Sequence, residues 1–415
     1  MAPTSVPQDI IETIIDELQD DLRTLTTCTL VSHTFRPQSQ KHIFSRIALL
    51  VYRNRRIQQI NDILSIHPEL ALYVRHLRIS LGRTPDHTLA RTVRMLTQIR
   101  SLHFGWLGSS VGWEKYSVDV KSAILDLFYL PSLAKISISK FKLFPCISAL
   151  GNSYQLRTLE LFDAFPPVED INDQSDPTAL DDSQLVEKDM RLDSLRLEFS
   201  FFFHFSAETS AHTALLQILI KPHVFPGIAC LRKLDVGWLT TSEEVKLCQK
   251  LLEVTTDSLQ DLTLRLGRPR AYVHSFWYSW HDSFKIWTGR GSQSLPPSLN
   301  LGSLSGLTTL SVAICATDTS LALLWLHQLL ESIPLVNKIE AFSLELTHGR
   351  VDLHDVSWRT LDSTITSWIS GRLRAVSLMS SSFMRSSPDV SFFTTVQMQG
   401  TFRKGILSVH GGVLP

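Results

Sequence analysis

The side chains that could carry out acid–base or metal chemistry are scattered along this sequence. Its 15 histidines include two close pairs, His274 with His281 and His348 with His354, and neither pair has a third metal ligand nearby. The acidic pair at 181–182 lies in an acid-rich stretch where burial cannot tune a carboxyl group for catalysis. No phosphate-binding glycine loop, HExxH motif or nucleophile elbow occurs in a strand–turn–helix setting. The sequence therefore predicts that the protein is not an enzyme and binds no metal or cofactor, with an unfamiliar catalytic site as the minor alternative.

The composition narrows the class of protein further. The 415 residues are 44% apolar and 19% charged, which supports a large core and excludes wholesale disorder. Forty basic residues balance forty acidic ones, so no global field attracts nucleic acid or an anionic membrane. The five cysteines form no CxxC pair, as in proteins of a reducing compartment. The N-terminus does not resemble a signal peptide, and the most apolar stretch, 321–330, is about half as long as a membrane span. We expect a soluble intracellular protein, cytoplasmic or nuclear, that binds neither nucleic acid nor membranes.

A short apolar phrase recurs along the chain and indicates a repeat architecture. It consists of one apolar residue, a second three positions later and a third two positions after that. The last two have the spacing of one face of a strand, and helical spacing follows between phrases, for example at Leu247, Leu251 and Leu252. The middle residues run from 77 to 376, which is 299 positions in nine intervals, or about 33 per unit. We therefore expect small strand–helix units that stack around a continuous core. The ten phrases are Val74-Leu77-Ile79, Ile99-Leu102-Phe104, Leu133-Ile136-Ile138, Leu156-Leu159-Leu161, Leu192-Leu195-Leu197, Leu231-Leu234-Val236, Leu259-Leu262-Leu264, Leu307-Leu310-Val312, Ile339-Phe342-Leu344 and Leu373-Val376-Leu378.

This pattern resembles leucine-rich repeats over roughly residues 70–385. The resemblance implies parallel strands on a concave face and helices on a convex face. Two departures predict an irregular arc: the units are longer than usual, and the consensus Asn or Cys after the strand is found only as Cys315. A chance scatter of the phrase in a leucine-rich chain is the alternative.

Two insertions interrupt the repeats. Residues 163–191 contain nine acidic residues and one lysine, which is typical of a solvated loop. The second insertion, 268–306, places Trp277, Trp280, Phe284 and Trp287 on one face of a helix. This aromatic face either covers the flank of the repeats or binds a partner, because Trp anchors dominate interface energetics.

In the first fifty residues the apolar positions follow helical spacing and predict three short amphipathic helices. The first begins after Val6-Pro7, Asp20 or Asp21 can cap the second, and the third begins near Pro37. So small a unit buries little apolar surface by itself, so we expect a partner to cover the rest. The apolar positions are Ile10, Ile11, Ile14, Ile15 and Leu18 in the first helix, Leu22, Leu25, Cys28, Leu30 and Val31 in the second, and Ile43, Phe44 and Ile47 in the third.

The string VPQDIIETIIDEL, with the later signature Leu-x-x-Cys-x-Leu-Val-Ser-x-x-Phe over 25–35, resembles the F-box. Val6 and Phe35 stand where Leu and Trp are commoner, and residues 67–80 resemble the junction between box and repeats in fungal F-box proteins. The resemblance implies docking on the Skp-type linker of an SCF-type cullin–RING ubiquitin ligase, while the repeats hold a client for ubiquitination. The positions that match the linker-contacting set are Pro7, Ile10, Ile14, Leu25, Leu30 and Val31, with Phe35 closing the small core.

Charge is unevenly distributed in this segment. Residues 9–21 contain six acids and no base, whereas residues 22–61 contain seven bases and no acid. Binding of nucleic acid would need interleaved aromatic residues and a wider basic field. We expect solvated helix faces that complement an acidic partner.

Together these patterns predict an α/β protein with three parts: a three-helix F-box-like domain (1–50), a connecting helix and linker (51–72), and an irregular leucine-rich-repeat-like solenoid (73–415). The expected function is a substrate-recruiting adaptor whose partners are a Skp-type linker, through it a cullin, and an unidentified client. The alternative is a repeat scaffold with no ubiquitin role, in which the helices only cap the repeat core. The candidate client-binding residues are Arg78, Arg196, Glu198, Arg265, Trp280, Trp287 and Glu345.

Overall fold

The computed structural model shows a chain of parallel strands that alternate with helices. It describes residues 6–50, 54–81, 87–106, 113, 116–142, 150, 153, 155–165, 191–198, 209–221, 225–239, 241–267, 298–315, 319–334, 337–347, 357–368, 372–380 and 398–410. Contacts divide the chain into two compact units, residues 1–191 and 192–415.

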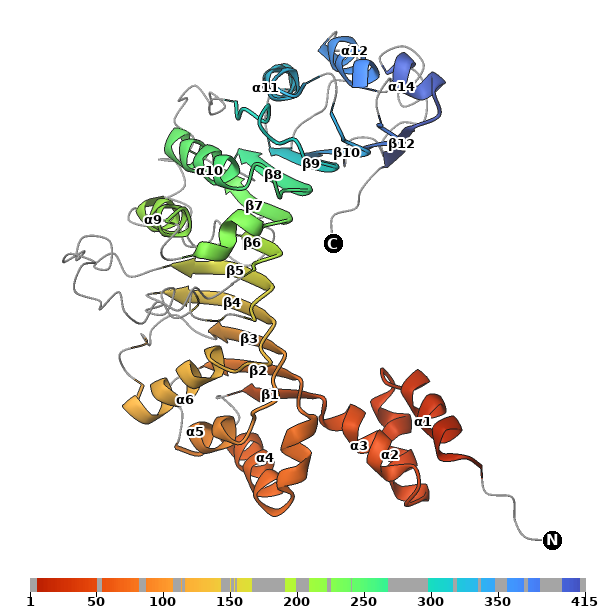
Figure 1. Cartoon of the computed structure of the whole chain (residues 1–415), viewed down its shortest axis with the longest axis vertical. Coiled ribbons are helices and arrows are strands. Elements are labelled where there is room, and N and C mark those ends of the chain that lie inside the picture. The colour runs from red at the N-terminus through yellow and green to blue at the C-terminus, as the bar shows by residue number, and fades with distance from the viewer. Residues whose placement is uncertain are drawn as a thin grey trace, which may run out of the picture. The chain divides into compact units, whose positions relative to one another are not determined.

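Unit 1 begins with three helices and continues into a sheet. The helices are α1 (Gln8–Glu17), α2 (Leu22–Val31) and α3 (Arg36–Phe44). Strands β1 (Arg46–Leu50), β2 (His76–Leu81), β3 (Ser101–Trp106), β4 (Lys135–Lys142) and β5 (Thr158–Phe165) follow, each parallel to the next. Between them lie α4 (Asn54–Ile66), the short 3₁₀ helix η2 (Pro68–Tyr73), α5 (His87–Arg94) and α6 (Val118–Phe128). Helices α4, α5 and α6 lie together along one side of these strands (Figure 1).

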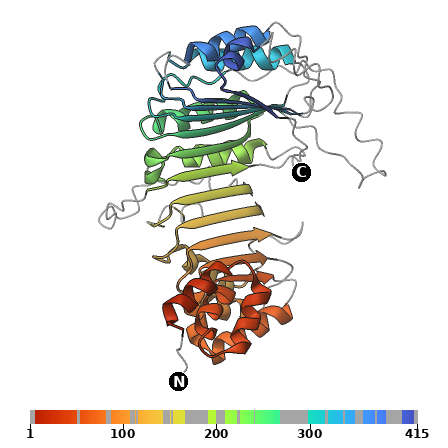
Figure 2. The ribbon, with the colours of Figure 1, turned by 90° about the vertical axis from the view of Figure 1, so that its right-hand side faces the viewer.

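Unit 2 repeats the same alternation. Its strands are β6 (Ser194–Glu198), β7 (Lys233–Leu239), β8 (Asp261–Gly267), β9 (Thr309–Cys315), β10 (Ala341–Thr347), β11 (Ala375–Ser380) and β12 (Leu407–His410). They pair in parallel and in chain order. The helical segments are α9 (Thr209–Leu219), η7 (Pro226–Cys230), α10 (Ser242–Val254), α11 (Thr319–Glu331), α12 (Ser357–Trp368) and α14 (Gln399–Arg403). Figure 2 shows the strands of each unit following one another in chain order.

The apolar phrase accounts for the strands. Each of the ten phrases places its last two residues in one strand, β2 to β11 in turn, and its first residue just before that strand. All thirty side chains are buried, with at most 4% of any of them exposed. The expectation of a repeat-like parallel α/β sheet is therefore confirmed.

One backbone carbonyl at the start of each strand joins it to the next repeat. The carbonyl oxygen of Arg75 accepts hydrogen bonds from the N–H groups of Arg100 and Ser101, at 2.8 and 3.0 Å. Because one acceptor binds two successive donors, the start of each strand is held at the same level as its neighbour. The same arrangement is found at Ser45, Arg100, Ala134, Asp193, Arg232, Gln260, Thr308 and Glu340.

Small residues stand directly before several strands and lie close to the backbone of the preceding repeat. The Ser132 hydroxyl donates to the carbonyl of Ile99 at 2.8 Å, and the Ser258 hydroxyl donates to the carbonyl of Leu231 at 2.8 Å. Gly306 occupies the corresponding position before β9, where an added Cβ would lie 3.1 Å from the carbonyl oxygen of Leu259. In these units the turn is therefore stabilised before the strand.

The structure corrects the expected start of the repeats. Residues 46–50 were predicted as part of the helical segment, with Ile47 on its third helix, but they form β1 and pair with β2. Phe44, Ile47 and Leu49 have the spacing of the repeated phrase. Ile43, Phe44 and Ile47 also fit the spacing of one helix face, so the sequence alone did not distinguish the strand from a helix. The first strand therefore precedes the range 51–72 that was expected to be a connecting helix and linker, and the boundary between compact units falls after Arg191.

Candidate protein-binding surfaces

The three N-terminal helices enclose a very small core of their own. Ile11, Ile15 and Leu25 are buried, and the side chains packed around them are Leu18, Cys28, Phe35 and Ile43. Asp21 caps α2, because its carboxylate accepts a hydrogen bond from the N–H of Thr24 at 3.0 Å. Of the two capping candidates in the sequence, Asp20 and Asp21, the structure uses the second.

A polar contact joins the first and third helices. The Asp16 carboxylate on α1 accepts hydrogen bonds from the side chains of Gln38 and His42 on α3, and the His42 Nε2–Asp16 Oδ1 distance is 2.6 Å. The bond from His42 and then the bond from Gln38 lower the pKa of Asp16, because both stabilise its ionised form. The contact fixes the crossing of α1 and α3 at the edge of the small core.

Several aliphatic residues in and just before these helices lie outside that core and face solvent. Between 48% and 80% of each side chain is exposed in a set that we call the aliphatic surface, which consists of Val6, Ile10, Ile14, Leu22, Leu30 and Val31. Ile10 and Ile14 are one helical turn apart and form one edge, and Leu30 and Val31 form the end of α2. The helices do not need these side chains for their own packing.

The residues predicted to contact a linker divide between this surface and the core. Pro7, Ile10, Ile14, Leu30 and Val31 are exposed, as a contact surface requires. Leu25 is a correction, since its side chain is 0% exposed and lies at the centre of the core. Phe35 is half-buried against the same core. Val6 and Leu22 belong to the exposed set and were not among the predicted contacts.

The third helix also lies against the repeats. It contacts β1 and η2, and an open apolar hollow of about 220 Å³ lies between α3, β1 and α4. The hollow is lined by Ile43, Phe44, Ile47, Ala48, Ile60 and Ile63, with Arg46 and Arg56 at its edge. Helix α3 therefore packs against the first repeat as well as against α1 and α2.

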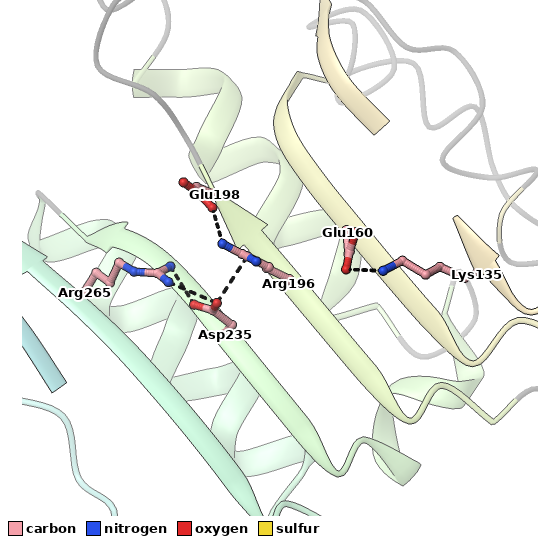
Figure 3. A network of polar contacts seen from close by, with 6 residues as sticks. All are labelled: Lys135, Glu160, Arg196, Glu198, Asp235 and Arg265. Atoms are coloured by element: carbon pink, nitrogen blue, oxygen red, sulfur yellow. Dashed lines mark hydrogen bonds and ion pairs between the residues drawn. The ribbon is translucent and has the colours of Figure 1, made fainter. Parts of the chain in front are cut away.

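A second candidate surface lies on the outer sheet face of unit 2. Arg265 donates to both carboxylate oxygens of Asp235 at 2.6 and 3.1 Å, and Arg196 contacts Asp235 at 3.3 Å and Glu198 at 2.7 Å (Figure 3). Burial raises the pKa of Asp235, and the guanidinium groups of Arg265 and Arg196 oppose that rise. Arg196, Glu198 and Arg265, predicted separately as client contacts, thus form one network.

Asp235 is the residue of this network that the sequence did not single out. It stands between Leu234 and Val236 of the phrase, so the alternation along β7 already places it on the outer face. Its partners lie on the two neighbouring strands, and only the register of β6, β7 and β8 brings them together.

The remaining predicted residues do not join that network. Glu345 is partly exposed on β10 of unit 2, and Arg78 is exposed on β2 of unit 1. Trp280 and Trp287, the histidine pairs and the acidic pair at 181–182 lie outside the described residues, as do most of the two insertions.

The closest approach to a catalytic geometry is a histidine on the outer face of unit 1. His103 on β3 places Nδ1 3.0 Å from the Ser137 hydroxyl and Nε2 3.5 Å from the Ser139 hydroxyl. In a Ser-His-Asp triad the second ring nitrogen of the histidine is held by a carboxylate, whereas here both nitrogens face hydroxyl groups. This cluster therefore differs from that triad.

No group of three or more His, Cys, Asp or Glu side chains among the described residues could hold a metal ion. No described helix is long and apolar enough to cross a membrane. Neither the models of known protein families nor the curated proteins contain a match to this chain.

Proposed function

We propose that this protein is a substrate-recruiting adaptor of an SCF-type cullin–RING ubiquitin ligase. In this role α1–α3 bind a Skp-type linker through the aliphatic surface, and the linker connects the protein to a cullin. The sheet of the repeats holds a client protein, with the charged network on β6–β8 as one contact region.

The aliphatic surface is the observation that carries this proposal. An exposed aliphatic side chain gains roughly 1.5–3 kcal/mol when a partner covers it, before entropy is subtracted. Six such residues on one small helical unit can support a stable complex, and side chains one turn apart suit a helix-in-groove contact. All members of the aliphatic surface except Leu22 also lie in the two strings that carry the F-box resemblance of the sequence.

The experiment compares linker binding by the full-length protein and two double variants. Ile10→Asp with Leu30→Asp introduces charge into the aliphatic surface, and we expect affinity for a purified Skp-type linker to fall by more than about a hundredfold. The matched control is Ile66→Asp with Val118→Asp, at two residues of unit 1 that are at least 72% exposed, and it should bind like the wild type. Binding is measured by calorimetry and co-purification, and unchanged circular dichroism shows that both variants fold. A wild-type protein that does not bind the linker contradicts the proposal.

A repeat scaffold without a ubiquitin role is the second candidate, and one contact favours it. Helix α3 contacts β1 and η2, as expected if the N-terminal helices cap the first repeat. A cap uses only the side of α3 that faces the repeats and gives no reason for exposing Ile10, Ile14, Leu30 and Val31. If the protein captures a client but neither the linker nor a cullin, the scaffold function is the correct one.

A further inference from the structure

Basic side chains gather on the outer face of the first three strands of unit 1. Arg46 on β1 is in register with His76 on β2, and Arg78 on β2 is in register with His103 on β3. Their strand neighbours Ile47, Leu77, Ile79, Leu102 and Phe104 are buried, so these four side chains point away from the core. Arg100 lies just before β3, close enough to His76 to influence its charge. We call these five residues the basic face.

The charge of the basic face is not neutralised within the described part of the chain. No described acidic side chain forms an ion pair with Arg78 or Arg100. Arg46 lies 3.7 Å from Asp20, but both side chains are at least 70% exposed, so solvent screens this pair. The Glu160 carboxylate on β5 lies 2.7 Å from the Lys135 ammonium group on β4 (Figure 3). Glu160 therefore forms its ion pair with Lys135 and not with an arginine of the basic face. Among the described residues of unit 1, the three arginines therefore have no strong anionic partner.

The two histidines lie within the electrostatic influence of these arginines. Burial, and then the charges of Arg46 and Arg100, lower the pKa of His76. Burial, Arg78 and Lys135 lower the pKa of His103, and only Glu160 opposes them. An anion bound between these groups would be stabilised by the arginines and would favour protonation of both rings.

We propose that the basic face binds an acidic peptide segment of a partner protein. Guanidinium groups bind carboxylates through paired hydrogen bonds. Arg46 and Arg78 stand on neighbouring strands, two register positions apart, so one extended acidic peptide can reach both. The described outward positions of β1–β3 hold no Phe, Tyr or Trp side chain, so the face lacks the large aromatic platforms on which single-stranded nucleic acid stacks. The proposal is independent of the linker-binding function, because it concerns other residues and can be tested without linker or cullin.

The test is a fluorescence-anisotropy titration of the full-length protein with labelled probes of equal length. The probes are an oligo-glutamate peptide, an oligo-glutamine peptide and an oligothymidylate. Wild-type protein should bind oligo-glutamate at least about tenfold more tightly than either other probe, and rising salt should weaken binding. Arg78→Glu with Arg100→Glu should weaken oligo-glutamate binding by at least about tenfold.

The charge-matched control is Arg55→Glu with Arg91→Glu, at exposed residues of α4 and α5 on the helical side of the sheet. It should bind oligo-glutamate within about twofold of the wild type, since it changes net charge equally but not the basic face. Arg78→Gln with Arg100→Gln serves as a milder variant if the glutamate variant does not fold. Equal loss in the control, equal binding of oligothymidylate, or no binding of oligo-glutamate by the wild type would each overturn the proposal.

Discussion

The repeats bury their aliphatic residues, whereas the N-terminal helices leave many of theirs exposed to solvent. In the repeats, the three residues of every phrase are buried by the strands and helices of the same chain. In α1–α3, the only buried aliphatic residues are Ile11, Ile15 and Leu25, and five aliphatic side chains remain exposed, with Val6 just before α1 as a sixth. Folding of the chain by itself explains the apolar residues of the repeats, because every phrase residue is buried in the core between strands and helices. The second leaves these side chains uncovered by the described part of the chain, which is the reason for proposing a partner.

The largest effect should come from truncating a phrase residue. Phe104 is fully buried on β3, and its ring and that of Trp113 pack edge to face at a centroid distance of 6.3 Å. Phe104→Ala removes that contact and leaves a cavity, so we expect the free energy of unfolding to fall by about 3–5 kcal/mol. Urea denaturation followed by tryptophan fluorescence measures the change. A loss below about 1 kcal/mol would mean that the phrases are not a continuous core, and the contrast with α1–α3 would collapse.

A smaller and pH-dependent effect should come from the contact that joins α1 to α3. The lowered pKa of Asp16 means that its ionised form stabilises the fold above the ordinary value of 3.8, and that this stabilisation disappears as the pH falls through the lowered value. Because the Asp16 side chain is 54% exposed, Asp16→Asn should weaken the helices by only about 0.5 kcal/mol at neutral pH. Hydrogen exchange of the α1 amides should therefore accelerate at neutral pH and match the wild type in strong acid. Asp9→Asn, in the first turn of α1, is the isosteric control. If Asp16→Asn accelerated hydrogen exchange more in acid than at neutral pH, the pKa of Asp16 would not be lowered by folding.

The comparison also explains how far the sequence predicts this protein. A repeated phrase specifies a strand and its buried face directly, which is why ten strands were predicted at the right places. β1 was missed because its phrase, Phe44-Ile47-Leu49, overlaps the end of a helix, and β12 was missed because its strand has no apolar residue at the first position of the phrase. Where a strand has one buried face, its register follows from the pattern.

Helical spacing alone does not say which apolar side of a small helix faces its neighbours. Leu25 and Leu30 lie on the same helix and both fit the F-box signature, yet one is the centre of the core and the other is 80% exposed. The choice depends on how α1 and α3 cross α2, which is set by packing and by contacts such as that of Asp16 with His42. The charged network around Asp235 was incompletely predicted for a related reason, since its members meet only through the register of three strands.

The smallest expected effect is the sharpest test of the contrast. Leu30→Ser with Val31→Ser removes two aliphatic side chains that are 80% and 68% exposed, and it leaves the buried core untouched. The free energy of unfolding should change by no more than about 0.5 kcal/mol, because surface substitutions away from packed features rarely cost more. The matched comparison is Leu25→Ser in the same helix, which buries a hydroxyl in the core and should destabilise α1–α3 clearly. Urea midpoints and hydrogen exchange of α1–α3 distinguish the two. If the surface pair destabilised the helices as much as Leu25→Ser, the exposed aliphatic residues would have a structural role within the chain and would no longer argue for an external partner.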